Sequence, residues 1–260
     1  MQYFKAISID TKTTMICGRG NEKAYLLEGG EHALLIDTLL PSEGNLRDFV
    51  REITDKPVSV VNTHGHPDHT GCNLDFGRCF IHPADIWMLY DDFYTPFAPM
   101  ITLPVTEGDY FELGDRRVDV AEVVGHTYGT IILLDNHTSA AFVGDAVNCN
   151  TLLNLPGSAS VEKYKSSLER LAEFRAKFDR MYLGHSLEAQ PPEHIDEAIE
   201  LCAEIMAGTD DKFQGGFTDE RSYYGKIRDK DFKRADGKTA NIVYSRENIY
   251  NRRMRAPVRL

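Results

Sequence analysis

Hydrophobic positions along the chain fall into short continuous runs that alternate with segments of helical spacing. The runs predict buried strands over residues 24–28, 33–37, 58–62, 78–81, 117–124, 130–134, 140–143, 180–183 and 241–244. Hydrophobic residues three or four positions apart predict helices over 43–54, over 161–174 and after Pro191-Pro192. Gly29-Gly30 predicts a hairpin turn between the first two strands. Strands that alternate with helices indicate the α/β class.

The regular pattern divides the chain into two parts. With 260 residues the chain is long enough to bury a sizeable core, and we assign residues 1–208 to a core domain. Residues 209–260 are polar, contain glycine and are less regular, so we expect a C-terminal extension packed on the same domain. This extension could cover a site or mediate dimerisation, and the sequence favours no particular oligomeric state.

The net charge restricts the classes of binding partner, and the cysteine pattern indicates the cellular compartment. The formal net charge of −11 argues against nucleic acid and anionic membranes, because phosphate groups are bound by clustered Lys and Arg. The basic stretch at 251–255 is expected to be a solvated tail. No apolar run reaches transmembrane length, and the N-terminus shows no secretory signal pattern. Five scattered cysteines without a CxxC pair predict a reducing compartment, the cytoplasm.

The densest chemical signal is the segment His64-Gly-His66-Pro-Asp68-His69. Imidazole and carboxylate are common side-chain ligands of transition metals. In an extended segment, positions 64, 66 and 68 project to the same side, and His69 can face a second, adjacent metal. The alternative is a surface turn that happens to be rich in His and Asp, and the tight spacing favours the metal site.

Three more candidate ligands follow predicted strands. Strand 117–124 ends at Gly125-His126-Thr127, strand 140–143 at Gly144-Asp145, and strand 180–183 at Gly184-His185. Ligands gather at the carboxyl ends of strands in open α/β sheets, so we expect these residues to join the cluster that follows strand 58–62. Seven ligands are too many for one tetrahedral zinc and suit two metals roughly 3.5–4 Å apart with one bridging carboxylate.

These motifs, in this order, resemble those of the metallo-β-lactamase superfamily. The HxHxDH motif is complete at residues 64–69, and the GHT, GD and GH elements stand at 125–127, 144–145 and 184–185. The resemblance covers roughly residues 15 to 206. It implies a four-layer αβ/βα sandwich with the metals at one edge between two sheets, and it makes residues 1–208 a hydrolase core.

The resemblance also implies how the ligands are divided. The first metal would be held by His64, His66 and His126, and the second by Asp68, His69 and His185, with Asp145 bridging. A bridging hydroxide, formed because metals lower the pKa of bound water, would attack the substrate, and Asp68 would also accept or shuttle the proton. Oxygen-reducing di-iron flavoproteins of the superfamily carry glutamate where this chain has His66. We therefore expect two Zn²⁺ ions, with Fe or Mn as alternatives.

The sequence leaves the substrate open. The leading hypothesis is hydrolysis of a small-molecule ester, thioester, lactone or lactam. The alternatives are a phosphodiesterase that uses the same metals and, as a non-enzyme, a metal- or ligand-sensing module. Tyr128 and Asn148 are candidate substrate contacts, although packing explains each equally well. The aromatic stretch at 87–99 either caps the core or forms a loop over the metals, and the nearby His82-Pro-Ala-Asp85 is expected to be structural.

Overall fold

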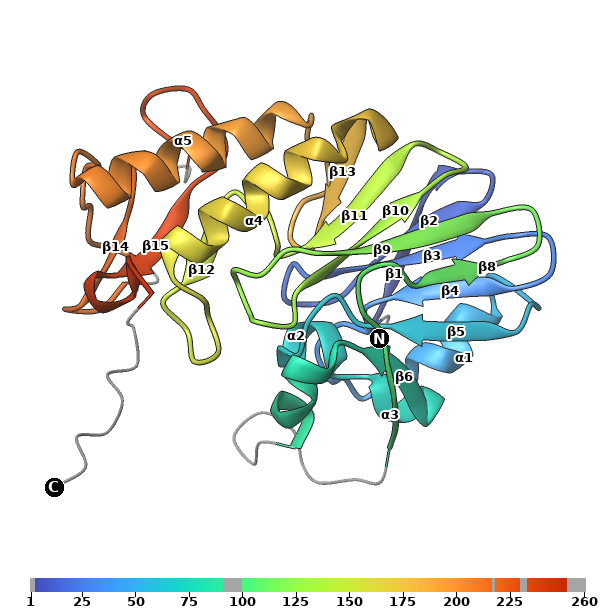
Figure 1. Cartoon of the computed structure of the whole chain (residues 1–260). Coiled ribbons are helices and arrows are strands. Elements are labelled where there is room, and N and C mark those ends of the chain that lie inside the picture. Colours follow the sequence, from blue (N-terminus) through green and yellow to red (C-terminus); the bar gives the residue numbers. More distant parts are fainter. Residues whose placement is uncertain (1–2, 91–99, 217, 230–232, 252–260) are drawn as a thin grey trace, which may run out of the picture.

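Two β-sheets form the centre of the molecule and pack face to face (Figure 1). The computed structural model describes residues 3–90, 100–216, 218–229 and 233–251. The first sheet has the order β1-β2-β3-β4-β5-β6-β7, with strands Lys5–Asp10, Thr13–Cys17, Lys23–Glu28, Ala33–Ile36, Val58–Val61, Arg78–Ile81 and Ile101–Pro104. The second has the order β13-β11-β10-β9-β8, with strands Arg180–Leu183, Ala140–Gly144, Ile131–Asp135, Arg117–Glu122 and Tyr110–Glu112.

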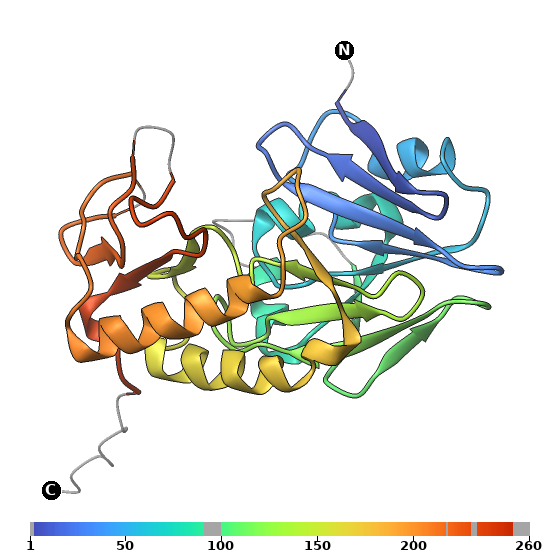
Figure 2. The same ribbon diagram turned by 90° about the horizontal axis from the view of Figure 1, so that it is seen from above.

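Helices cover the outer face of each sheet. The α-helices are α1 Leu46–Arg51, α2 Pro67–Thr70, α3 Asn73–Phe76, α4 Val161–Glu173 and α5 Glu193–Ala207. Short 3-10 helices span Pro83–Tyr90, Arg175–Lys177 and Arg246–Asn248. Figure 2 shows α4 and α5 side by side along the second sheet, while α1 and α3 lie against the first. The layers are thus helix, sheet, sheet and helix, which confirms the predicted αβ/βα sandwich.

The continuous hydrophobic runs are strands that bury both of their faces. In β10, Ile131 and Leu133 point into the core between the two sheets. The alternate residues, Ile132 and Leu134, point into the core beneath α4 and α5. Since successive side chains of a strand project to opposite faces, a strand between two cores must be apolar at every position. The same double burial explains the run that forms β4, which is fully buried along its length.

The C-terminal segment forms a third, smaller sheet with a strand of the core. Its order is β12-β15-β14, with strands Thr151–Leu153, Ile242–Ser245 and Ser222–Tyr224. β15 pairs in parallel with β12, and Ile242 and Tyr244 belong to the same hydrophobic cluster as α4 and α5. The segment therefore packs directly on the core. The division of the chain at residue 208 stays a prediction.

Some expected features lie outside the described part of the chain. Residues 91–99, most of the aromatic stretch, and residues 252–260, most of the basic tail, are not described. Within the described ranges, no helix is both long and apolar enough to cross a membrane. The five cysteines carry free thiols, and a cytoplasmic location stays a prediction.

Candidate metal centre

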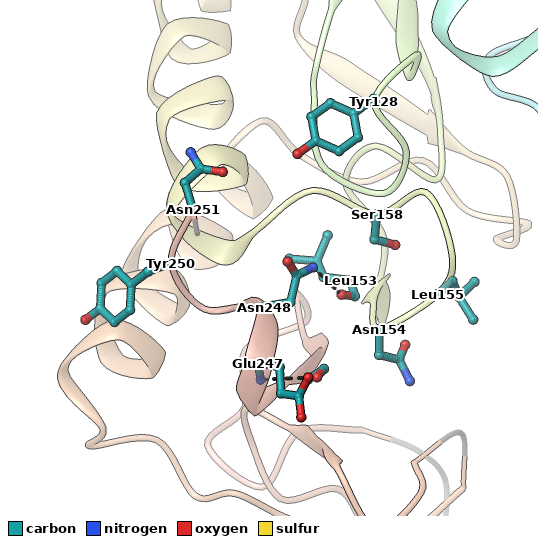
Figure 3. Close-up of a pocket in the computed structure, with 10 residues that line it drawn as sticks. Tyr128, Leu153, Asn154, Leu155, Ser158, Glu247, Asn248, Tyr250 and Asn251 are labelled. Atoms are coloured by element: carbon teal, nitrogen blue, oxygen red, sulfur yellow. Dashed lines mark hydrogen bonds between the residues drawn. The ribbon is translucent and has the colours of Figure 1, made fainter. Parts of the chain in front are cut away.

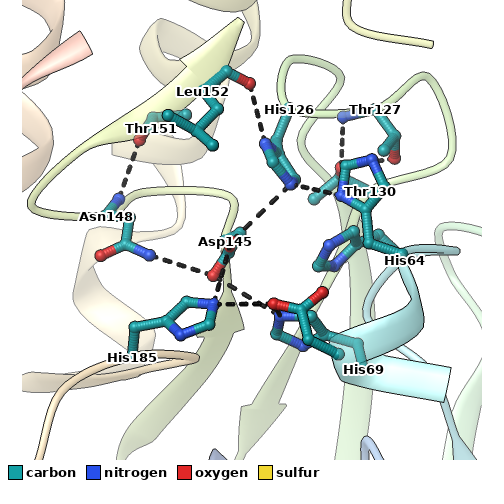
Figure 4. A network of polar contacts seen from close by, with 12 residues as sticks. His64, His69, His126, Thr127, Thr130, Asp145, Asn148, Thr151, Leu152 and His185 are labelled. Atoms are coloured by element: carbon teal, nitrogen blue, oxygen red, sulfur yellow. Dashed lines mark hydrogen bonds and ion pairs between the residues drawn. The ribbon is translucent and has the colours of Figure 1, made fainter. Parts of the chain in front are cut away.

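The candidate ligands converge at one edge of the two sheets, where four strands end (Figure 4). β5 leads into the loop and helix that carry the 64–69 cluster, and β9, β11 and β13 lead to the other three ligands. The ligand atoms form three overlapping groups, within each of which they lie no more than 4.8 Å apart: His64, His66 and His126; His64, Asp68 and His69; His69, Asp145 and His185. The fold thus brings together all seven residues proposed from the sequence.

In the first group, three imidazoles face one another. Nδ1 of His66 lies 2.8 Å from Nε2 of His126. Nδ1 of His126 lies 2.8 Å from the carbonyl oxygen of Leu152 and donates to it, so Nε2 is the ring nitrogen that faces the cluster. His64 is fully buried, and its Nδ1 contacts the Thr63 hydroxyl at 3.1 Å. Each ring therefore turns one nitrogen towards a common point.

The second and third groups share His69, and each contains a carboxylate. Nε2 of His185 lies 3.2 Å from Asp68 Oδ2 and 3.4 Å from Asp145 Oδ2. Nε2 of His69 lies 3.7 Å from a carboxylate oxygen of each of the same two residues. Asp145 Oδ2 is also 3.7 Å from Nε2 of His126. The Asp145 carboxylate therefore contacts imidazoles from both sides of the cluster, and its bridging role stays a prediction.

Burial lowers the pKa of two imidazoles of the first group, His64 and His66. Desolvation, followed by the nearby His126, lowers the pKa of His66 to about 3. Desolvation and the surrounding imidazoles hold the pKa of His64 well below its ordinary value. Both rings are neutral at physiological pH, which is the form that binds a metal ion.

In the second and third groups, carboxylates surround the imidazoles of His69 and His185. Burial alone would lower the pKa of His69 and of His185. The carboxylates of Asp68, Asp145 and, for His69, Asp37 outweigh it, and they raise the pKa values to about 9 and about 11. Burial would raise the pKa of Asp68, but His69 and His185 lower it to about 2. The carboxylates around His69 and His185 thus favour positive charge at this position, which a bound cation would also supply.

The donor set passes a structural test for transition metals. Nε2 of His64 and Nε2 of His69 are buried and have no hydrogen-bond partner. Buried polar atoms are nearly always hydrogen-bonded, so an orphaned atom calls for an explanation such as an ion. The other nitrogen of each ring is already engaged, by Thr63 and Asp37 respectively. Nitrogen and oxygen donors in this geometry suit zinc, iron or manganese.

Two buried carboxylates orient the ligands, and the sequence identified neither as part of the site. Asp37 accepts from the backbone N–H and the hydroxyl of Thr63, at 2.7 and 2.8 Å, and lies 2.7 Å from Nδ1 of His69. Asp37 directly follows β4, the strand beside β5. Its place at the end of a predicted strand is the feature of the sequence that could have identified it as part of the site. Partners of this kind fix the tautomer and the direction of a metal-binding imidazole.

The second carboxylate, Asp85, joins two ligand-bearing loops. It accepts from the N–H of Gly65 at 3.0 Å, from the Thr127 hydroxyl at 2.6 Å and from the N–H of Gly129 at 2.9 Å. Gly65 lies between two candidate histidines, and Thr127 follows a third. We expected a structural role for the segment 82–85, and its Asp85 holds these two loops together.

Crowding explains the glycines that precede the later ligands. A Cβ at Gly184 would lie 2.6 Å from Asp145 Oδ1 and 2.7 Å from Cε1 of His69. A Cβ at Gly125 would lie 2.1 Å from the ring of Tyr164, and Gly144 has a φ of 49°, which favours glycine. Crowding also explains Gly65, because a Cβ there would lie 2.8 Å from Cβ of Met88 and 2.9 Å from the carbonyl oxygen of Asp85.

A cavity of about 650 Å³ opens beside the candidate ligands. Leu152, Leu155 and Pro67 contribute an apolar wall. Asn148 lines the same cavity, and its Nδ2 donates to Asp145 Oδ1 at 3.0 Å. Tyr128 lines a neighbouring cavity instead and is 51% exposed. Contact of either residue with substrate stays a prediction.

Comparisons with known proteins agree with this geometry. The family model described as the metallo-beta-lactamase superfamily matches residues 17–185. Acyl-coenzyme A thioesterase MBLAC2 of Bos taurus is 29% identical over 198 residues, which cover 64% of this chain and 70% of the relative. Hydroxyacylglutathione hydrolase of Hyphomonas neptunium is 34% identical over 137 residues, which cover 50% and 48%. The metallo-β-lactamase FIM-1 of Pseudomonas aeruginosa, solved in a mono-zinc form, aligns with a TM-score of 0.63 at 16% identity over 78% of this chain and 96% of that one, and so shares the fold.

Proposed function

The chain belongs to the metallo-β-lactamase superfamily and is a hydrolase of that fold, and on this premise we propose that it hydrolyses thioesters at a dinuclear zinc centre. The observation that carries the proposal is the pair of buried Nε2 atoms of His64 and His69, which have no hydrogen-bond partner. Together with the five other candidate ligands around them, they support two ions rather than one.

The proposed division of the ligands starts from the compact group of three histidines, His64, His66 and His126. We propose that His64, His66 and His126 hold one ion, that Asp68, His69 and His185 hold the other, and that Asp145 bridges them. Bound metal ions supply Lewis acidity and lower the pKa of water towards neutrality. The mono-zinc form of a solved structure with the same fold supports zinc as the first choice, and iron or manganese stay alternatives.

Asp68 is the best-placed residue to move the proton. Its carboxylate is ionised, since its pKa is about 2, and its side chain is 29% exposed, towards the cavity that it lines. It can accept the proton of the attacking water and release it to the departing thiolate, so that thioester and water give acid and thiol. Asn148 stabilises the Asp145 carboxylate through its Nδ2 hydrogen bond.

Thioesters are favoured over the other substrates by two observations. Two relatives, an acyl-coenzyme A thioesterase and a hydroxyacylglutathione hydrolase, are named for the cleavage of thioesters. The cavity wall of Leu152, Leu155 and Pro67 also suits an apolar acyl group. We infer that the acyl half of the substrate lies against this wall while its carbonyl faces the candidate ligands.

The test combines metal analysis with turnover of a panel of substrates. We expect about two metal ions per chain, thioesterase activity that a chelator abolishes, and recovery on adding Zn²⁺. The variant His64→Ala should lose at least about 100-fold in kcat/KM. The matched control, His32→Ala, removes an exposed imidazole outside the cluster and should leave kcat/KM unchanged.

Other outcomes would redirect the assignment. An active preparation free of transition metal would refute the metal mechanism. Turnover of bis(p-nitrophenyl) phosphate without turnover of thioesters would establish the phosphodiesterase alternative. Ligand binding without turnover on any ester, lactam or phosphodiester would favour a sensing module.

A further inference from the structure

A cavity of about 620 Å³, the basic cavity, lies at the edge of the first sheet where β5 and β6 begin. Its walls come from α1, the loop that leads into β5, the end of α3 and the start of β6 (Figure 1). The described lining holds one acidic residue, Asp55, and four cationic ones: Arg47, Arg51, Lys56 and Arg78. The sequence shows no basic run here, because the four cations are spread from α1 to β6 and only the fold brings them together.

Two of the four cations have no acidic partner. Arg47 and Arg78 form no ion pair with any residue in the described ranges. Arg51 lies 3.9 Å from Asp48, but both of these side chains are more than half exposed, and such surface pairs contribute little. The guanidinium groups of Arg47 and Arg78 therefore carry positive charge that the protein itself leaves open to a ligand.

The remaining charges around the cavity offset only part of this excess. Lys56 lies 3.7 Å from Glu28, which makes it the best neutralised of the four cations. Asp55 is exposed, so solvent screens its attraction for the neighbouring cations. Even when Glu28, Asp48 and Asp55 are all counted, the cavity keeps a positive charge in a chain whose formal net charge is −11.

The stability of α1 does not explain its two arginines. Arg47 and Arg51 are four positions apart, so they share one face of the helix. Like charges at this spacing destabilise a helix slightly. Arg51 lies in the last turn, where a cation is favourable, but Arg47 lies in the first turn, where the helix dipole opposes it. An anion bound between the two arginines would relieve both effects.

The cavity offers a hydrogen-bond donor and apolar walls as well as charge. Thr54 lines it and is 6% exposed. Its hydroxyl accepts from the Lys56 N–H at 3.3 Å, so the hydroxyl proton can be donated to a ligand. Val50, Val58 and Phe76 supply apolar walls, which strengthen the attraction between a guanidinium group and an anion. Guanidinium groups bind phosphate oxygens through paired hydrogen bonds, so phosphate is the anion that this lining suits.

The basic cavity is separate from the candidate metal centre. It lies where β5 begins, whereas the candidate metal ligands follow the end of that strand. Val58 and His64 are six residues apart, which is roughly 20 Å along an extended chain. Neither the cavity of the metal centre nor the cavity beside it (Figure 3) shares a lining residue with the basic cavity. A molecule bound here would not touch the candidate metal ligands.

We propose that the basic cavity binds a small molecule that carries a diphosphate group or two neighbouring phosphate groups. One guanidinium group can hold one phosphate in a bidentate manner, and the cavity provides three. Arg47 and Arg78 make the main ionic contacts, and Thr54 donates a hydrogen bond. The net negative charge of the chain favours a small ligand over nucleic acid or a membrane surface, because an extended polyanion would also meet the acidic surroundings.

The test measures binding of inorganic pyrophosphate by isothermal titration calorimetry. We expect its affinity to exceed that of orthophosphate by at least about tenfold, because the second phosphate meets a further guanidinium group. Arg47→Gln and Arg78→Gln should each weaken pyrophosphate binding by about tenfold or more. The matched control Arg180→Gln removes an exposed arginine of β13 with the same change in net charge, and it should leave the affinity within about twofold.

Two further variants separate this cavity from other sources of affinity. Asp55→Asn removes the acidic residue of the lining and should strengthen pyrophosphate binding about two- to threefold. Pyrophosphate can also bind metal ions, so the titration is repeated with His64→Ala, which should keep the affinity within about twofold. Far-UV circular dichroism of each variant checks that it is folded.

The proposal would be overturned by an absence of binding up to about 1 mM pyrophosphate or by equal losses in Arg78→Gln and Arg180→Gln. Loss of binding in His64→Ala with retention in Arg47→Gln and Arg78→Gln would place the anion at the candidate metal centre instead. Binding of heparin or of phosphatidylserine vesicles without binding of pyrophosphate would replace the small ligand with an extended polyanion. None of these outcomes alters the proposed thioesterase function, which is tested by turnover.

Discussion

Replacing Asp85 with asparagine tests whether hydrogen bonds behind the ligands control metal binding. The carboxylate accepts three hydrogen bonds, two on Oδ2 from Gly65 and Thr127 and one on Oδ1 from Gly129. An asparagine amide has one acceptor oxygen, so in either orientation its NH₂ group faces a backbone N–H. The change keeps the shape of the side chain and removes at least one hydrogen bond to a charged acceptor.

The expected loss of stability is the free energy of the lost hydrogen bonds, reduced by the desolvation penalty that the neutral amide avoids. A hydrogen bond to a charged group contributes about 1.5–3 kcal/mol, and a buried donor left unpaired costs a further 1–3 kcal/mol or so. Burial raises the pKa of Asp85, so the neutral amide recovers part of the desolvation penalty. We expect Asp85→Asn to lower the free energy of unfolding by about 2–3 kcal/mol and metal affinity by about 10- to 100-fold.

Two measurements separate these effects. Urea unfolding of the metal-free protein reports stability, and competition with a chromogenic chelator reports metal affinity. The control is Asp75→Asn, which alters a partly buried carboxylate that accepts from Leu46 N–H of α1 at 2.7 Å instead of from a loop that carries ligands. If both variants lose stability but Asp85→Asn binds metal as tightly as the unchanged protein, Asp85 supports the fold alone and the reasoning is wrong.

Three further changes probe the same framework. Gly184→Ala places a methyl group against Asp145, and we expect at least about a tenfold loss of metal affinity by chelator competition. Asp37→Asn turns an amide NH₂ towards either His69 Nδ1 or the Thr63 N–H and should cost about 10- to 100-fold in affinity for one of two ions, measured by calorimetric titration. Asp135→Asn leaves the buried Arg116 unpaired and should cost about 3–5 kcal/mol in urea unfolding at pH 7. Because Arg116 and neighbouring donors lower the pKa of Asp135 despite its burial, the folded carboxyl binds a proton less readily than the unfolded one. Its stabilisation is therefore full above the unfolded pKa of about 3.9 and is lost as pH falls below it, so the difference between variant and unchanged protein should shrink in acid.

Strands buried on both faces could be predicted because their sequences differ most from a solvated chain. β4, β5, β10, β11 and β13 lie within or near the predicted runs. The strands that the sequence analysis did not predict include β1, β7 and β8, which are largely exposed or half-buried and carry a mixed pattern. β12 was also not predicted, because it has only three residues and pairs with β15, some ninety residues further along the chain. Edge strands and long-range pairs depend on partners that local patterning does not reveal.

The candidate site also combines residues that the sequence reveals with residues that only the fold reveals. The 64–69 cluster could be found because four ligands of the right types stand within six residues. Asp37 and Asp85 are single carboxylates whose role appears only when β4 and the 83–90 helix pack beside the cluster. Tyr128 was a candidate substrate contact, and the fold places it at the neighbouring cavity. Side-chain direction in a loop depends on what packs against that loop, which no spacing encodes.

The two parts of the site are therefore under different physical constraints. The candidate ligands follow strands that two hydrophobic cores hold from both sides, so a change there disturbs the fold as well as the chemistry. The cavity walls come from the segment after β12 and from residues 245–251, which are joined to the core by a few hydrogen bonds such as those of Asn248. Because loops shape the pocket while strand ends carry the candidate ligands, we expect substrate choice to depend on these loops rather than on the ligand motif.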